Sequence, residues 1–340
     1  MHVNRFKLFF SILTMLLVSS SFYITTPEAK AITVSPVRTE ARAEPGQTIP
    51  GKFLVINDDR DTKLLYLLVY NFNAKDESGL PEFSPKQENL STWINLPKTI
   101  TLGPREQKTV EYTIAIPENT EPGGYFSGIF SSSLPPEEQD DGSIALGSQV
   151  GTLVLLSVGG SITESTSILE FKTKDKKVFS SLPVDFYFRF QNSGESWVKP
   201  KGDVIIENTF KQTSKVIQAN PDGSNVLPKS IRRFELAWLT NAGSEVQDEN
   251  AERPPAPPEG FWNKVKHEWK YFALGRYTAN LTLTYNNDTS TTQTAVASFW
   301  VIPWHFLAVA IPSILILLII LYLIIKYYNR YIVSRSQKRR

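Results

Sequence analysis

The sequence predicts an all-β chain of two tandem β-sandwiches, with a short amphipathic helix inserted in the second sandwich and one transmembrane helix near the C-terminus. Three observations support this fold class. Apolar and polar residues alternate with a period of two along many short segments, turn residues separate those segments, and a long uncharged apolar run stands near the end of the chain. Alternation buries one face of a strand and leaves the other in water, and many short strands separated by turns are typical of a β-sandwich.

Residues 1–31 are predicted to be a secretory signal peptide. Arg5 and Lys7 precede the apolar stretch 8–18, which is too short to span a bilayer. Ala29-Lys30-Ala31 then provides a small-x-small cleavage site. Cleavage leaves a chain that begins near Ile32, and an uncleaved N-terminal helix is the alternative.

Composition indicates a folded exported part and excludes several kinds of site. The 340 residues include no cysteine, so a disulfide framework is excluded and core burial must hold the fold together. Charged residues make up 21% of the chain and the net charge is +2, which argues against a nucleic-acid-binding face. The three histidines show no triad or metal-ligand spacing, so we expect no catalytic residue, no metal and no cofactor.

The first half of the exported part, 32–163, is predicted to be one immunoglobulin-like β-sandwich. Residues 110–116 alternate between apolar and polar, as a strand on the surface of a core does. Residues 63–72 are apolar on both faces, which favours a central strand. Turn residues such as Glu44-Pro45-Gly46 and Pro122-Gly123-Gly124 separate the strands.

The same pattern returns in residues 164–303, which are predicted to form a second immunoglobulin-like β-sandwich. Alternation recurs at 184–191 and at 277–285. Each half also contains a strand that ends in an asparagine before a polar turn, Asn57 in the first and Asn192 in the second. The boundary lies at a short glycine hinge, and a single larger domain is the alternative.

The second sandwich carries an insert at 244–272. Its first part, 244–258, is acidic and then rich in proline, which predicts an extended loop. Residues 261–272 place aromatic side chains at helical spacing and predict an amphipathic helix. Because the following hairpin leads to the membrane, this helix should lie at the bilayer end of its domain, where it either rests on the headgroups or caps its own sandwich. The expected interfacial residues are Trp262, Lys264, Trp269, Lys270, Trp300 and Trp304.

The apolar run near the C-terminus is predicted to be a single transmembrane helix, 304–325. Residues 306–325 carry no charge, and a helix of that length rises about 30 Å, which matches the hydrocarbon core of a bilayer. A basic cytoplasmic tail, 326–340, follows and sets the orientation. Its anchor residues are Lys326, Arg330, Arg335, Lys338, Arg339 and Arg340. We therefore expect a single-pass plasma-membrane protein, with the lipid bilayer as one partner and the sandwiches outside the cell.

Two groups of residues are candidates for a ligand or partner surface. Trp93 and Trp197 stand near predicted turns, where a ring either stacks on a sugar or packs in a core or domain interface. The loop 133–149 of the first sandwich is the second candidate. Loop carboxylates can ligate Ca²⁺, but EF-hand spacing is lacking, so solvated hairpin turns are the favoured interpretation. The acidic residues of this loop are Glu137, Glu138, Asp140 and Asp141.

Several short motifs carry a resemblance to a known family. In order, they are Ile32–Pro36, Glu44–Gln47, Leu102–Val110, Gly123–Ile129, Phe190–Gly194, Pro200–Gly202 and Leu227-Pro228. With these motifs the chain resembles the WxL-interacting cell-surface proteins of Gram-positive bacteria. The resemblance implies an immunoglobulin-like domain of peptidoglycan-binding type, a second of host-binding type, one transmembrane helix and a basic tail. The insert 244–272 departs from the family pattern.

These features favour a non-catalytic binding or adhesion protein at the cell surface, and the resemblance implies peptidoglycan or another surface protein as its ligand. Two alternatives stay open. The chain could be an accessory single-pass subunit of a larger membrane complex. It could also be a cell-wall-modifying enzyme, which would need two carboxylates that converge in a cleft.

Overall fold

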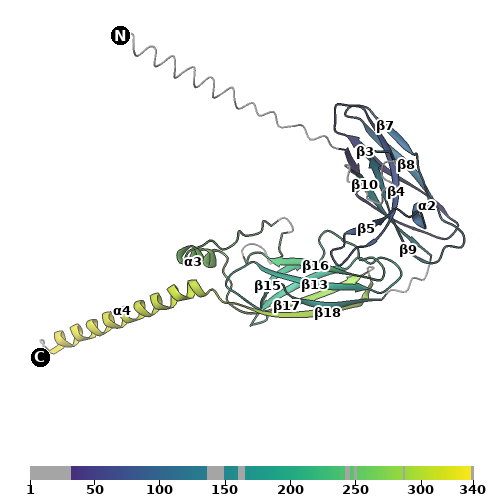
Figure 1. Ribbon diagram of the computed structural model, residues 1–340. Coiled ribbons are helices and arrows are strands. Elements are labelled where there is room, and N and C mark those ends of the chain that lie inside the picture. The colour runs from purple at the N-terminus through teal and green to yellow at the C-terminus, as the bar shows by residue number, and fades with distance from the viewer. Residues whose placement is uncertain are drawn as a thin grey trace, which may run out of the picture.

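The computed structural model describes residues 32–135, 149–159, 165–241, 246–248, 251–285 and 288–337, without the side chains of 288–291 and 331–337. The predicted signal peptide and the predicted boundary at 163/164 lie outside this part of the chain. Within it, the protein forms two β-sandwiches in tandem, a short helix beside the second and a long C-terminal helix (Figure 1).

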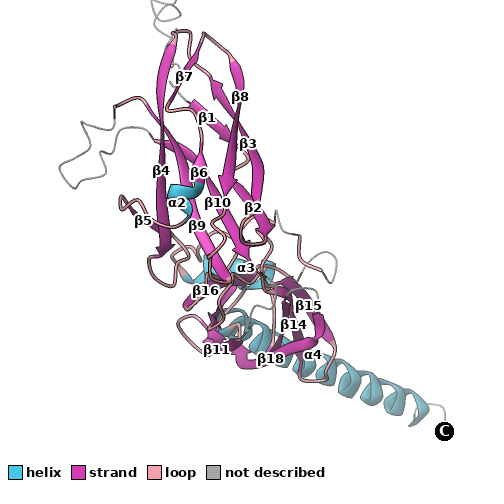
Figure 2. Cartoon of the chain, turned by 90° about the vertical axis from the view of Figure 1, so that its right-hand side faces the viewer, coloured by secondary structure: helices cyan, strands magenta, loops and turns pink. Residues whose placement is uncertain are grey.

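The first sandwich consists of two packed sheets, whose strands run along its long axis (Figure 2). One sheet has the order β1-β3-β8-β6, and the other has the order β2-β10-β9-β4-β5, with β7 also paired to β4. This is the A-B-E-D and A′-G-F-C-C′ arrangement of an immunoglobulin-like sandwich. The elements are β1 (Ile32–Ser35), β2 (Arg38–Ala43), β3 (Thr48–Asn57), β4 (Lys63–Ala74), β5 (Pro81–Ser84), α2 (Leu90–Trp93), β6 (Ile94–Asn95), β7 (Thr99–Leu102), β8 (Gln107–Ala115), β9 (Gly123–Ser132) and β10 (Val150–Val158).

The second sandwich repeats this arrangement. Its sheets have the orders β11-β13-β16 and β12-β18-β17-β14-β15, which correspond to A-B-E and A′-G-F-C-C′. The predicted fold class is therefore confirmed. The strands are β11 (Thr166–Thr173), β12 (Val178–Phe179), β13 (Val184–Asn192), β14 (Lys201–Asn208), β15 (Thr213–Gln218), β16 (Ser230–Trp238), β17 (Gly275–Tyr285) and β18 (Asp288–Val301).

Each sandwich has its own buried core. Phe53 and Ile129 belong to the first core, and Phe186 and Trp238 belong to the second. Burying a side chain of this size stabilises the folded state by about 1.5–3 kcal/mol. The predicted central strand is β4, which pairs with β9 on one side and with β5 and β7 on the other. It is apolar on both faces because Leu65 and Leu67 point into the first core, whereas the rings of Tyr70 and Phe72 pack on Phe130 and Phe83 on the other face.

A buried asparagine closes the same kind of turn in both sandwiches. Asn57, at the end of β3, is fully buried and donates from Nδ2 to the carbonyl oxygens of Asp61 and Gly103, each at 2.8 Å. Asn192, at the end of β13, donates to two carbonyl oxygens in the same way, and one of them again lies four residues along the chain. Each Oδ1 accepts the N–H two residues further on. Buried polar groups need hydrogen-bond partners. An asparagine at the end of each strand supplies both a donor and an acceptor to nearby backbone groups.

The helices of the second half lie at one end of its sandwich. The amphipathic helix α3 (Phe261–Lys270) precedes β17, and α4 (Trp304–Gln337) follows β18. The segment Trp304–Arg330 is long and apolar enough to cross a membrane, with a mean hydropathy of 3.0. Helix α4 therefore begins where the sequence predicted but continues through residue 337, into the basic tail.

Charged residues join the two sandwiches on two sides. Arg189 of β13 donates two hydrogen bonds, in bidentate geometry, to the carboxylate of Glu77. Glu77 lies in the turn between β4 and β5. This bond lowers the pKa of Glu77. Glu40 of β2 accepts hydrogen bonds from Asn225 at 2.9 Å and from Lys199 at 3.1 Å. Burial raises the pKa of Glu40, but these two bonds together with the positive charges of Lys199 and Arg38 outweigh it, so the net shift is downward.

Backbone and ring contacts complete this junction. The N–H of Gly124 donates to the carbonyl oxygen of Glu195 at 2.7 Å. The rings of Phe126 and Trp197 meet edge to face, with centroids 6.1 Å apart. In Figure 1 the first sandwich joins one end of the second, and α4 leaves the opposite end. The first sandwich is therefore the part farthest from α4.

Candidate binding surfaces

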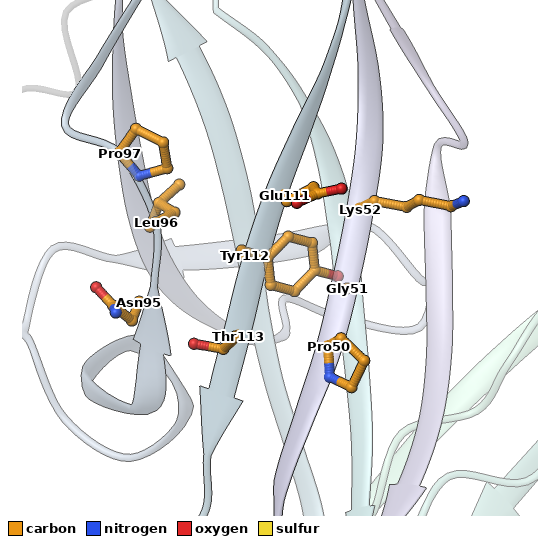
Figure 3. A pocket seen from close by; sticks show the side chains of 9 residues that line it. All are labelled: Pro50, Gly51, Lys52, Asn95, Leu96, Pro97, Glu111, Tyr112 and Thr113. Atoms are coloured by element: carbon orange, nitrogen blue, oxygen red, sulfur yellow. The ribbon is translucent and has the colours of Figure 1, made fainter.

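An open groove lies on the outer face of the first sandwich, across β3, β8 and β6 (Figure 3). Its volume is about 740 Å³. In the β3–β8 register Lys52 lies opposite Glu111, which pairs two opposite charges across the groove, and Pro50 lies opposite Thr113. The wall on the β6 side is formed by Asn95, Leu96 and Pro97.

The floor of the groove depends on a glycine. Gly51 lies opposite Tyr112 in the same register, and a Cβ at Gly51 would stand 2.2 Å from Cζ of that ring. Tyr112 is only 3% exposed. Burial raises the pKa of its hydroxyl, which also hydrogen-bonds Thr39 of the opposite sheet. The ring therefore crosses the core beneath the groove, and only glycine leaves room for it.

Strand β8 has an open edge beside this groove. β6 covers only the end of β8, with Ile94 opposite Ile114 and Asn95 opposite Thr113. The chain then crosses to the other sheet, where β7 pairs with β4. In the part of the chain that the structure describes, no strand pairs with this edge of β8 over residues 107–112.

The backbone direction along this edge follows from the ends of β8. The carbonyl oxygen of Glu106 accepts the N–H of Asn57, and the N–H of Ile116 donates toward the start of β3, so both point to the β3 side. Backbone groups alternate between the two sides of a strand. Thr109 and Glu111 therefore direct their N–H and C=O groups to the open edge. Such an edge is a template for one more strand.

The two tryptophans that are candidates for ligand binding, Trp93 and Trp197, each pack against another aromatic ring. Trp93 ends α2, is partly buried against the first core and has its ring 4.7 Å from that of Tyr125. Trp197 packs on Phe126 at the junction of the sandwiches. A ligand role for either ring stays a prediction. The acidic candidates Glu137, Glu138, Asp140 and Asp141 belong to 136–148, which the structure does not describe.

A second hollow, of about 490 Å³, lies at the junction of the sandwiches. Its lining includes two carboxylates, Glu121 and Glu195, and both side chains are exposed. A glycosidase needs its acidic carboxyl group in an apolar pocket, and neither of these carboxylates is buried. Among the described residues, no group of three histidine, aspartate or glutamate side chains could hold a metal ion.

The predicted interfacial residues surround the start of α4. Trp262 and Trp269 of α3 are each 65% exposed, and Trp304, the first residue of α4, is 60% exposed. Trp300 of β18 is also exposed. Lys270 is exposed, whereas Lys264 is half-buried.

The predicted basic anchor is only partly within the described residues. Lys326 and Arg330 lie at the end of the apolar segment of α4. Arg335 lies on the same helix, without a described side chain. Lys338, Arg339 and Arg340 fall beyond the last described residue.

Sequence reasoning missed Glu268, which the structure places at the contact between α3 and α4. Its side chain is 3% exposed and lies 2.7 Å from Nδ1 of His305. A signal was present, because Glu268 shares a helical stripe with Phe261 and Val265, which are apolar. A lone carboxylate in an apolar stripe indicates a specific partner.

Comparisons with known proteins describe the fold only. No protein-family model matches the chain, and no curated protein matches its sequence. It is similar to the class 5 fimbriae chaperone CfaA, with 9% identity and a TM-score of 0.38 over 78% of this chain and 99% of that chain. It is also similar to a chaperone–tip adhesin complex of CFA/I fimbriae, with 9% identity and a TM-score of 0.37 over 78% of this chain and 98% of that chain. For the CupB2 chaperone of Pseudomonas aeruginosa the identity is 9% and the TM-score is 0.33, over 78% of this chain and 98% of that chain. At these values the similarity supplies no argument about function, and the resemblance to WxL-interacting proteins stays a prediction.

Proposed function

We propose that this protein is a membrane-anchored, non-catalytic surface protein that binds an extended segment of a partner surface protein along the open edge of β8. In this proposal α4 is the anchor and the second sandwich stands next to the membrane. The first sandwich presents the binding edge away from the bilayer. The observation that carries the proposal is the uncovered run of β8 beside the groove.

The length and composition of α4 support the anchoring. The apolar segment has 27 residues, and none of its most apolar window is buried inside the protein. A helix of 27 residues rises about 40 Å, enough to cross the hydrocarbon core and reach both interfaces. The basic residues that follow it favour an outer location for the two sandwiches.

The shape of the groove favours an extended polypeptide over a sugar. Tyr112 lies beneath the groove at 3% exposure, so it offers no ring face for stacking. The backbone groups of Thr109 and Glu111 match an added strand, whose own groups repeat with a period of two. The apolar wall of Leu96 and Pro97 can contact the side chains of that strand.

Photo-crosslinking in intact cells tests this proposal. A photoreactive amino acid at Thr109, which is exposed beside the open edge, should give an adduct with another polypeptide. The matched control is Asp203, which is equally exposed but lies on β14, a strand with neighbours on both sides. Adducts only with wall glycan, or equal adducts at both positions, contradict the proposal.

A backbone variant tests the strand-addition geometry itself. Thr109→Pro removes the N–H that points to the open edge and leaves the β3–β8 hydrogen bonds in place. It should abolish crosslinking from a photoreactive residue at Glu111, while circular dichroism stays unchanged. Unchanged crosslinking in a folded Thr109→Pro protein means that the partner does not bind as a strand.

A further inference from the structure

Helix α3 exposes a stripe of large aromatic side chains beside the first turn of α4. We propose that this stripe binds anionic phospholipid headgroups in the membrane that α4 spans. In this arrangement α3, which we call the foot, fixes the orientation of the second sandwich relative to the membrane. The inference rests on the membrane anchoring in the proposed function but is independent of the β8 edge.

The exposed apolar residues gather at one end of the second sandwich. Arg276 lies opposite Trp300, and Asn208 lies opposite Tyr277, so the β14–β15 turn, the start of β17 and the end of β18 are neighbours. This is also the end from which α4 leaves, because α4 directly follows β18. The exposed large apolar residues at this end are Phe210, Phe261, Trp262, Trp269, Phe272, Leu274, Trp300 and Trp304. A cluster of this kind marks an interaction surface.

Charge identifies the lipid. Helix α3 contains three lysines, and its one acidic residue, Glu268, is buried. Lys266 lies between Trp262 and Trp269 on the exposed stripe, since the three residues are four and three positions apart. Tryptophan and lysine on one helical face are the residues that anchor a helix in the headgroup layer, and clustered lysine attracts anionic lipid.

Contacts with α4 determine the depth of the foot. Glu268 accepts the backbone N–H of Phe306 through Oε2 at 2.8 Å and lies 2.7 Å from Nδ1 of His305 through Oε1. The first N–H groups of a helix have no partner inside the helix and favour a negative charge. The ring of Trp269 lies 5.0 Å from that of Phe306. Because these contacts involve the first turn of the spanning helix, α3 lies at headgroup depth.

The opposite face of α3 connects the foot to the sandwich. His267 is buried, and burial lowers its pKa. The carbonyl oxygen of Tyr271, the residue after α3, accepts the N–H of Leu182 at 3.2 Å. Leu182 belongs to the core of the second sandwich. The foot therefore contacts the core on one side and the anchor on another, which leaves the tryptophan stripe for lipid.

Site-directed spin labelling of the full-length protein in nanodiscs tests the foot. Since the chain has no cysteine, Lys266→Cys gives one labelled site on the stripe, and Asp203→Cys gives a control site on the same sandwich. In discs with anionic phosphatidylglycerol, the Lys266 label should be shielded from a water-soluble nickel relaxant, and the Asp203 label should stay accessible. In discs of neutral phosphatidylcholine, the Lys266 label should be more accessible than in anionic discs.

Two further variants separate lipid binding from folding. Trp262→Ala/Trp269→Ala should expose the Lys266 label, whereas Leu80→Ala, which truncates a similarly exposed apolar residue of the first sandwich, should not. Replacing Lys264 or Lys270 by glutamine should lower the ratio of shielded to accessible label about fivefold in anionic discs.

Each outcome bears on the foot separately from the anchor. A Lys266 label that is as accessible as the Asp203 label in anionic discs overturns the proposal. Equal shielding in both lipids and in detergent shows that another protein surface, not lipid, covers the stripe, and this also overturns it. Resistance of the protein to alkaline carbonate extraction tests α4 alone, so the anchoring can hold when the foot fails.

Discussion

Replacing Gly51 by alanine should destabilise the first sandwich by about 2–4 kcal/mol. The new methyl group would lie 2.2 Å from Cζ, 2.4 Å from Cε2 and 2.5 Å from Oη of Tyr112. Carbon atoms in contact need about 3.5 Å, so the ring must move by about 1 Å inside a packed core. Overpacking costs about 1–3 kcal/mol, and loss of the hydroxyl bond to Thr39 adds about 1 kcal/mol.

Hydrogen exchange in increasing urea, followed in peptides from β3 and β8, measures this effect in the first sandwich without the second. Gly103→Ala is the matched control, because a Cβ there meets only the flexible carboxylate of Glu106, at 3.2 Å. Tyr112→Leu provides a second background that removes the ring. In that background, Gly51→Ala should cost less than about 1 kcal/mol, because the colliding atoms are gone.

The reasoning is refuted by either of two results. One is a Gly51→Ala protein whose exchange free energy lies within about 0.5 kcal/mol of the unmodified protein, the usual size of a surface substitution. The other is an equal loss for Gly51→Ala in the presence and absence of the Tyr112 ring, since this would locate the strain elsewhere.

Three more predictions follow from the contacts of single side chains. Asn192→Ala should destabilise the second sandwich by about 2–4 kcal/mol, measured by urea denaturation, because it removes a buried amide that donates to the carbonyl oxygens of Ser196 and Val226 and accepts the N–H of Gly194. Glu268→Ala should speed hydrogen exchange at Phe306, measured by mass spectrometry, because it removes the acceptor of that N–H. The pKa values of Glu40 and Glu77 are lowered in the folded protein, so their contribution is complete above about pH 4.3, the ordinary glutamate value, and is lost as the pH falls through the lowered values. The distribution of distances between spin labels on the two sandwiches should therefore be narrow at pH 7 and broaden once the pH falls below the lowered pKa values.

The strands could be predicted from the sequence because burial on one face leaves a period of two in the residues. Residues 277–285 alternate and form β17, and the apolar stretch 63–72 lies within the central strand β4. The turn asparagines Asn57 and Asn192 are a repeat visible in the sequence, and both are buried donors to two carbonyl groups in the structure.

The groove and the contact of Glu268 with the first turn of α4 could not be predicted, because both depend on contacts between distant segments. The open edge of β8 exists because the chain after Asn95 changes sheets, which no local pattern reports. Gly51 is separated by many residues from Tyr112, the ring that requires it. Glu268 finds its partners on another helix, so only its place in an apolar stripe marks it.

The course of β18 has a mechanical consequence. This strand leads directly into α4, whereas β11, the first strand of the same sandwich, starts at the end that faces the first sandwich. If a bound partner were pulled away while the bilayer held α4, the force would therefore stretch the second sandwich lengthwise. Gln293 of β18 accepts the N–H of Ile168 at 2.9 Å and donates to the carbonyl oxygen of Thr166 at 2.7 Å, which ties the two terminal strands together. Force along this axis loads the β17–β18 ladder in shear, so under the proposed anchoring many of its hydrogen bonds would have to break together before the strands separate.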